Sequence, residues 1–248
     1  MRTVYRKREQ VKTEQKLEIL FEDNHIIAVN KRVSDIVQGD KTGDTPLVDI
    51  VKDYIKEKYN KPGEVFLGLP HRLDRPTSGI VIFARTSKAL VRLNKMFQEK
   101  DLKKIYWAIV SSPPPKSSGS LEHYLSRNTK QNKSYAFDQE KPLSKRALLN
   151  YKQIANSDKY ILLEIELKTG RHHQIRAQLS KIGCSIKGDL KYGAKRSNPD
   201  KGISLHSRQL QFIHPVKKEQ VNIIAPVPEN ALWTFFEEKL KETALPVS

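Results

Sequence analysis

Cysteine and long apolar runs are scarce in this sequence, and both absences narrow the classes of protein to which it can belong. Cys184 is the only cysteine, so the chain forms no internal disulfide, which suits a reducing cytosol. The longest apolar runs, such as 26–29 and 80–84, fall far short of the roughly 20 residues that a membrane-spanning helix needs. The basic first residues lack the apolar segment of a secretory signal. We therefore expect a cytoplasmic protein that does not span a membrane.

Several enzyme motifs are missing as well. The sequence has no G-x-x-x-x-G-K-[ST] loop for nucleoside triphosphates, no G-x-G-x-x-G loop for dinucleotides and no H-E-x-x-H zinc motif. His172 and His173 are adjacent, so on a helix they would diverge by about 100° and could not readily share a metal. A metal-dependent nuclease would need clustered acidic ligands, whereas Asp74 is the sole acid in its motif. We therefore predict no metal site.

Positive charge is abundant. The 248 residues include 45 Lys and Arg against 28 Asp and Glu, a net charge of +17, and the pI is about 9.8. Such a balance is typical of chains that bind a polyanion, and nucleic acid is the leading partner. At 38% hydrophobic residues, the chain is long enough to build one sizeable core.

The chain divides into a basic N-terminal arm over 1–16 and one domain over 17–248. Apolar patterning predicts strands over 17–21, 25–29, 64–69, 80–84, 104–110, 145–154, 160–168, 203–213 and 221–225. Apolar residues at helical spacing predict helices after the caps Thr45-Pro46 and Thr86, and again over 172–182 and 230–240. In the last of these helices, Leu232, Phe235, Phe236 and Leu240 are expected to face inward. The stretch 111–120 contains nine Ser, Pro or Gly residues in ten and predicts a flexible crossover within one sheet rather than a domain boundary. Many strands without regular βαβ alternation favour an α+β fold.

Two segments carry dense charge where a core pattern would place apolar residues: 71–79 and 169–176. In the first, Asp74 lies between Arg72 and Arg75. A carboxylate flanked by guanidinium groups stays ionised, and in a partly desolvated setting it can act as a nucleophile or base. The alternative is an ordinary surface salt bridge in a polar loop.

The first of these segments resembles a known family signature. His71-Arg72-Leu73-Asp74-Arg75-Pro76-Thr77-Ser78-Gly79 is similar to the H-R-L-D-x-x-T-S-G motif of RluA-type pseudouridine synthases. Further matches keep the family order over about residues 17–240: Asn30-Lys31, Lys104-Ile105-Tyr106, Thr169-Gly170-Arg171, His173-Gln174-Ile175-Arg176, Gly188-Asp189, Tyr192-Gly193 and Leu205-His206. The S4 RNA-binding domain that many relatives carry has no counterpart in residues 1–16.

The resemblance implies isomerisation of uridine to pseudouridine in ribosomal or transfer RNA by one essential aspartate, Asp74, with no cofactor. A glycosidase needs two carboxylates because it protonates a leaving group and activates water, whereas here uracil leaves and returns to the same sugar. Asp74 would either attack C1′ or remove the C2′ proton, and the sequence leaves both routes open. The implied fold is a central, mainly antiparallel mixed sheet with flanking helices and an RNA-binding cleft, working as a monomer.

The resemblance also implies the other roles. Arg176 would pair with Asp74, Tyr106 would stack on the uracil and help take the C5 proton, and Arg72 would enter the base stack as the target uridine flips out. Arg171 and Leu205 would contribute to substrate binding, although Tyr106 and Leu205 also fit a plain core role.

The sequence departs from the family pattern at several positions. Relatives usually read Asn-Lys-Pro-x-Gly where this chain has Asn30-Lys31-Arg32-Val33-Ser34, and they differ at His172, Gln178 and Cys184-Ser185. These differences bear on substrate choice and loop geometry. A non-catalytic RNA-binding or assembly factor that keeps the fold is the alternative function, and the intact aspartate, tyrosine and arginine argue against it.

Overall fold

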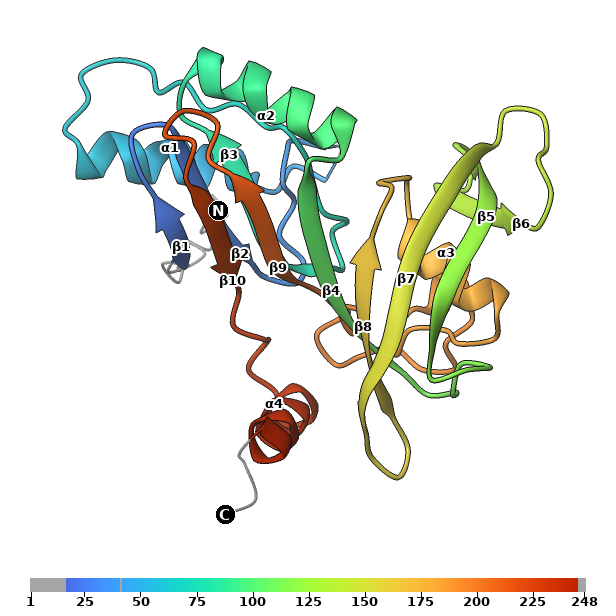
Figure 1. The fold of residues 1–248 in the computed structure, drawn as a ribbon. Coiled ribbons are helices and arrows are strands. Elements are labelled where there is room, and N and C mark those ends of the chain that lie inside the picture. The colour runs from blue at the N-terminus through green and yellow to red at the C-terminus, as the bar shows by residue number, and fades with distance from the viewer. Residues whose placement is uncertain (1–16, 41, 245–248) are drawn as a thin grey trace, which may run out of the picture.

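A single ten-stranded sheet runs through the molecule. The structure, a computed structural model, describes residues 17–40 and 42–244, so the basic arm expected over 1–16 lies outside the described residues. The strands are β1 (Ile19–Glu22), β2 (Ile26–Lys31), β3 (Ser78–Ala84), β4 (Leu102–Val110), β5 (Ser118–Asn128), β6 (Lys133–Phe137), β7 (Lys145–Asn156), β8 (Ile161–Leu167), β9 (Leu205–Ile213) and β10 (Gln220–Ile224). Their order is β1-β2-β3-β9-β4-β8-β7-β5-β6, with β10 paired to β9 (Figure 1).

The expected α+β fold with a mainly antiparallel mixed sheet is confirmed. All strand pairs are antiparallel except β3 with β9, which run parallel through Ser78↔His206 and Gly79↔Ser207. The connection after β4 leads to β5, which lies three strands away in the sheet. The Ser/Pro/Gly-rich stretch is therefore a crossover within one sheet, as predicted.

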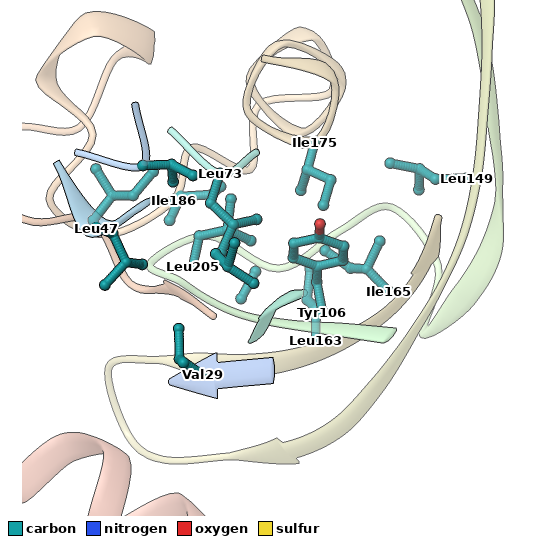
Figure 2. Close-up of a cluster of buried hydrophobic side chains, with 14 of the residues drawn as sticks. Val29, Leu47, Leu73, Tyr106, Leu149, Leu163, Ile165, Ile175, Ile186 and Leu205 are labelled. Carbon is teal, nitrogen blue, oxygen red and sulfur yellow. The ribbon is translucent and has the colours of Figure 1, made fainter. Parts of the chain in front are cut away.

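Helices cover both faces of the sheet. On one face α1 (Leu47–Lys58) and α3 (Gln174–Lys181) pack against β2, β3, β4 and β8 around the largest core cluster (Figure 2). On the other face α2 (Ser87–Glu99) packs against β2, β3, β9 and β10, and α4 (Ala231–Ala244) packs against β4 and β8. In Figure 1, α1 and α3 lie toward opposite ends of the sheet, with β9, β4 and β8 between them.

The predicted helix boundaries are confirmed at Thr86 and Gly183 and are wrong at Thr45. Thr86 caps α2 by accepting a hydrogen bond from the Ala89 amide, as the sequence predicts. Gly183 follows α3 with a left-handed φ of 79°, the conformation that glycine adopts most easily after a helix. Thr45 does not cap α1, since Pro46 occupies the cap position without a side-chain hydrogen bond.

Other expectations are wrong. Residues 64–69 form no strand beyond one bridge from Gly68 to Ala84, and Phe235 of α4 is 42% exposed while Trp233 is buried instead. Strands β5 and β6 escape sequence analysis because their buried positions alternate with charged and polar ones, and the buried set includes His123 and Ser134. Helix α3 begins at Gln174 rather than His172, a difference that changes the site described next.

No helix among the described residues is long and apolar enough to cross a bilayer.

Candidate active site

A buried lysine donates hydrogen bonds to the backbone of the loop that carries Asp74. Lys31, at the end of β2, is 1% exposed, and its Nζ donates to the carbonyl oxygens of Arg32, Arg75 and Thr77 at 2.9, 3.1 and 2.7 Å. Burial lowers the pKa of this ammonium group to about 8, although nearby Asp35 and Asp74 oppose the shift. Two of the three acceptors, the carbonyl oxygens of Arg75 and Thr77, closely follow Asp74, so the ammonium group ties this part of the loop to the end of β2.

The end of the same loop is joined to β9. The Ser78 hydroxyl and His206 Nδ1 lie 2.9 Å apart, and the Ile203 amide donates to the Pro76 carbonyl at 3.0 Å. A side chain at Gly79 would meet the Ser207 carbonyl oxygen at 2.3 Å, so only glycine permits this parallel contact. The junction brings Leu205 next to the Asp74 loop.

Arg176 contacts two carboxylates from opposite sides. Its Nη1 donates to Asp74 Oδ2 at 3.1 Å, while its Nε and Nη2 form a bidentate pair with Asp189 at 2.7 and 2.9 Å. Burial disfavours the charged form of Arg176, yet the hydrogen bonds and charges of Asp189 and Asp74 together outweigh it and raise the Arg176 pKa. The expected Asp74–Arg176 pair is present, and Asp189, which sequence analysis quoted only as part of a motif, holds the arginine in place.

His173 approaches the same oxygen of Asp74. Its Nε2 lies 3.4 Å from Asp74 Oδ2, and its Nδ1 lies 3.0 Å from the Tyr192 hydroxyl. That hydroxyl accepts a hydrogen bond from the Ser134 amide at 2.8 Å and has the Ser134 carbonyl oxygen as an acceptor at 3.1 Å. Both protein contacts of the Asp74 carboxylate fall on Oδ2, which leaves Oδ1 without a partner among the described residues.

Tyr106 forms an aromatic floor of the cleft that Asp74 also lines. Its ring rises from β4 with the hydroxyl directed toward Ile175 of α3, among Leu73, Leu205 and other core side chains (Figure 2). The ring is 8% exposed, and burial raises its pKa to about 12, with the Asp74 carboxylate adding to the effect. The phenol is therefore neutral at ordinary pH, and Tyr106 and Leu205 belong both to the core and to the wall of the cleft.

A cleft of about 1030 Å³ opens above this floor. Asp74 and Asp40 are the acidic residues that line it, against a larger set of cations: Arg72, Arg75, Lys100, Lys104, Arg127, Arg171, Arg176 and Lys191. Arg72 and Arg171 are exposed, and Arg171 Nε donates to the Arg146 carbonyl at 3.0 Å. A concave surface with this charge suits a polyanion.

The residues that depart from the family pattern have structural partners. His172 was expected to diverge from His173 on a helix, but both precede α3, and their rings stack with centroids 3.8 Å apart. His172 also bonds Ser134 Oγ at 2.9 Å and Asn132 Oδ1 at 3.1 Å, which ties the β5–β6 hairpin to the cleft. Gln178 is fully buried and donates to the carbonyl oxygens of Leu121 and Ala147.

The structure thus gathers the six predicted site residues, Arg72, Asp74, Tyr106, Arg171, Arg176 and Leu205, around one cleft. Four further residues of the site had no expected role: Lys31, His173, Asp189 and Tyr192. All four lie inside the quoted motifs, so the motif matches were the signal that could have identified them. His71 has a structural setting: its Nε2 accepts from the Ile82 amide at 3.0 Å and its ring stacks on Phe97.

Chemically, the described residues offer the Asp74 carboxylate, whose Oδ1 has no protein partner among them, in a basic cleft with an aromatic floor. The described residues contain no group of three or more metal-ligating side chains that could hold an ion. This combination suits covalent or base catalysis on a bound nucleic acid.

Comparisons with known proteins point in the same direction. Residues 25–181 match a family model described as RNA pseudouridylate synthase. Ribosomal large subunit pseudouridine synthase D of Zymomonas mobilis is 32% identical over 224 residues, covering 86% of this chain and 70% of that protein. Ribosomal large subunit pseudouridine synthase C of Rickettsia prowazekii is 30% identical, covering 85% and 68%. The structure of human RNA pseudouridylate synthase domain containing 4 covers 90% of this chain and 93% of its own with a TM-score of 0.73 at 23% identity, which shows a shared fold.

Proposed function

Because this chain belongs to the RluA-type RNA pseudouridylate synthase family and isomerises uridine to pseudouridine in RNA, we propose that Asp74 is its catalytic group. The observation that carries the proposal is the asymmetry of the carboxylate: Arg176 and His173 both contact Oδ2. Oδ1 is then the oxygen available to the ribose. Among the described residues, Asp74 and Asp40 are the acids that line the cleft, and Asp74 is the one whose charge acts on the Tyr106 phenol.

The reaction breaks the N1–C1′ bond, turns the uracil over and forms a C5–C1′ bond. Asp74 either attacks C1′ directly or removes the proton from C2′, and both routes need an ionised carboxylate. Arg176 donates a hydrogen bond to Oδ2 and so orients the carboxylate. After the new bond forms, the proton on C5 leaves and N1 gains a proton. Tyr106, a neutral phenol that lines the cleft, can serve as a relay that gives up its own proton as it accepts the one from C5.

Substrate binding follows from the cations and apolar groups of the cleft. A uridine must leave its stack to reach Asp74, and flipping costs a few kcal/mol that the enzyme has to offset. We assign Arg72, exposed at the cleft beside Asp74, to the space that the flipped base vacates. The Tyr106 ring and Leu205 provide apolar surface for the uracil, and Arg171 contributes charge at the rim.

The substrate class is ribosomal or transfer RNA, and the names of the two relatives favour ribosomal RNA. We propose that residues 17–248 act as one catalytic domain, that residues 1–16 add a basic arm for RNA, and that the protein works as a cytoplasmic monomer. The net charge of +17 supports strong electrostatic attraction to the RNA backbone.

Tritium release from bulk RNA labelled at uridine C5 tests the assignment of Asp74. Wild-type protein should release tritium, and Asp74→Asn should not, because its amide is neither a nucleophile nor a base. The variant must still bind the RNA, which a filter-binding titration verifies. Release by Asp74→Asn at the wild-type rate would disprove the assignment, and binding without release by either protein would favour the non-catalytic RNA-binding factor.

A further inference from the structure

His173 is a buried histidine with an unusual backbone beside the proposed catalytic group. It immediately precedes α3 with φ 53° and ψ 27°, the left-handed region that residues other than glycine seldom enter. It is 8% exposed. Such conformations persist where the surrounding structure imposes them, and they often mark functional positions.

The ring is held on several sides. Tyr192 contacts Nδ1 through its hydroxyl and meets the ring edge-on at a centroid distance of 5.6 Å, and His172 stacks on one face. Ser134 of β6 supports both neighbours, since its amide donates to Tyr192 and its hydroxyl bonds His172. The imidazole therefore has little freedom to rotate away from Asp74.

The partners of the two ring nitrogens indicate which tautomer His173 adopts. Burial lowers the pKa of His173 to about 3, although Asp74 opposes the shift, so the ring is neutral and carries one N–H. If Nδ1 carried it, the Nε2 lone pair would face the Asp74 carboxylate 3.4 Å away, a repulsive arrangement. If Nε2 carries it, the Tyr192 hydroxyl donates to Nδ1 at 3.0 Å rather than to its other acceptor, the Ser134 carbonyl oxygen at 3.1 Å, and the Nε2–H lies on the side of Asp74 Oδ2, 3.4 Å away.

We propose that His173 is a positioning residue that donates its Nε2 proton to Asp74 Oδ2, in a chain of hydrogen bonds that runs from the Ser134 amide through the Tyr192 hydroxyl. Together with Arg176 it fixes Oδ2, so that Oδ1 faces the ribose. Catalytic hydrogen bonds are often long before substrate binds and shorten in the complex, which accounts for the 3.4 Å separation. This inference rests on the proposed catalytic role of Asp74.

A matched pair of substitutions at His173 tests the donor directly. The amide nitrogen of glutamine reaches the position of Nε2, whereas that of asparagine reaches only the position of Nδ1. With enzyme in excess over C5-tritiated bulk RNA, His173→Ala and His173→Asn should slow release about 10- to 100-fold, the effect of losing a hydrogen bond to a charged group. His173→Gln should recover at least about fivefold over His173→Ala, and the enzyme concentration for half-maximal rate should stay within about twofold.

Tyr192→Phe provides a second, independent test because it keeps the aromatic ring that packs on Arg176 and removes only the hydroxyl. It should slow release about 3- to 10-fold, the expected loss for one neutral hydrogen bond that acts through another. His123→Ala serves as the control: His123 is also buried, with a lowered pKa, and bonds Gln178 rather than Asp74. Its saturating rate should match wild type.

Each outcome decides the matter. A wild-type saturating rate in His173→Ala, equal losses in the Gln and Asn variants, or losses confined to RNA affinity would overturn the inference. If thermal melting shows that the His173 variants do not fold, Tyr192→Phe decides, and a wild-type rate in that variant overturns the inference. Failure of the parent proposal is separate, because it appears as activity in Asp74→Asn.

Discussion

Substituting Asp189 by asparagine should damage stability far more than substituting Asp74, although both carboxylates bind the same arginine. Asp189 is 1% exposed, and it takes two hydrogen bonds from Arg176, which is 5% exposed. Removing one partner of a buried ion pair typically costs about 3–5 kcal/mol because an uncompensated charge stays behind. Since Asp74 still offsets part of that charge, we expect about 3 kcal/mol for Asp189→Asn.

The melting temperature converts this into an observable. In a chain of this length each kcal/mol corresponds to about 2–4 °C, so Asp189→Asn should melt about 6–12 °C below wild type. The Asp74 side chain is 31% exposed, and pairs of that kind contribute about 1 kcal/mol or less. Asp74→Asn should therefore melt within about 4 °C of wild type while it loses tritium release.

Differential scanning calorimetry on the two variants and wild type, in one buffer, provides the comparison. Asp189→Asn should retain some release activity, because Arg176 still contacts Asp74. Equal melting temperatures for the two variants, or a larger drop for Asp74→Asn, would refute the assignment of Asp189 to stability and Asp74 to chemistry.

Three further predictions use other parts of the chain. Gly79→Ala should destabilise the protein by at least about 2 kcal/mol, since its Cβ would meet the Ser207 carbonyl at 2.3 Å, whereas Gly39→Ala, with open space around it, should melt like wild type. Between pH 8 and 10.5 the unfolded chain holds a proton that native Lys31, with its pKa lowered to about 8, has released. The contribution of Lys31 to the free energy of unfolding should therefore rise with pH over this range, by up to about 3 kcal/mol. Urea titrations at several pH values measure the rise, which should be absent in Lys31→Met. Arg127→Gln, at the cleft, should reduce the salt slope of RNA binding by about 1 in filter-binding titrations, and the exposed Lys159→Gln on the β7–β8 turn should leave it unchanged; a wild-type slope in the first variant would contradict the assignment.

Much of the fold follows from local sequence patterns. Continuous apolar runs identify β2 and β3 because these strands are buried on both faces, and Thr86 marks the start of α2. Strand β5 is invisible to the same reasoning because its inward side chains include His123, which is satisfied by Gln178 from α3. A polar residue whose partner is distant in sequence carries no local hydrophobic signal.

The candidate site likewise has a part that the sequence predicts and a part that it does not. Asp74, Tyr106 and Arg176 follow from matched motifs, whereas the approach of His173 to Asp74 and Tyr192 depends on the left-handed backbone just before α3. Sequence analysis extended that helix back over His172 and so separated two rings that in fact stack. The backbone at His173 deviates from helical geometry because the surrounding side chains require it, and periodicity cannot reveal such a position.

Double-variant cycles separate the two functions of Arg176. If its buried pairing with Asp189 stabilises the fold, then Asp189→Asn combined with Arg176→Met removes both charges, and the cost should be at least about 2 kcal/mol less than the sum of the single costs. The half-exposed pairing with Asp74 predicts near additivity, within about 1 kcal/mol, when Asp74→Asn is combined with the same arginine substitution. The reverse order of coupling energies in urea unfolding would contradict the structure. The expected order explains how one guanidinium can be fixed by a carboxylate that the substrate never reaches, and so be presented without rearrangement to the carboxylate that reacts.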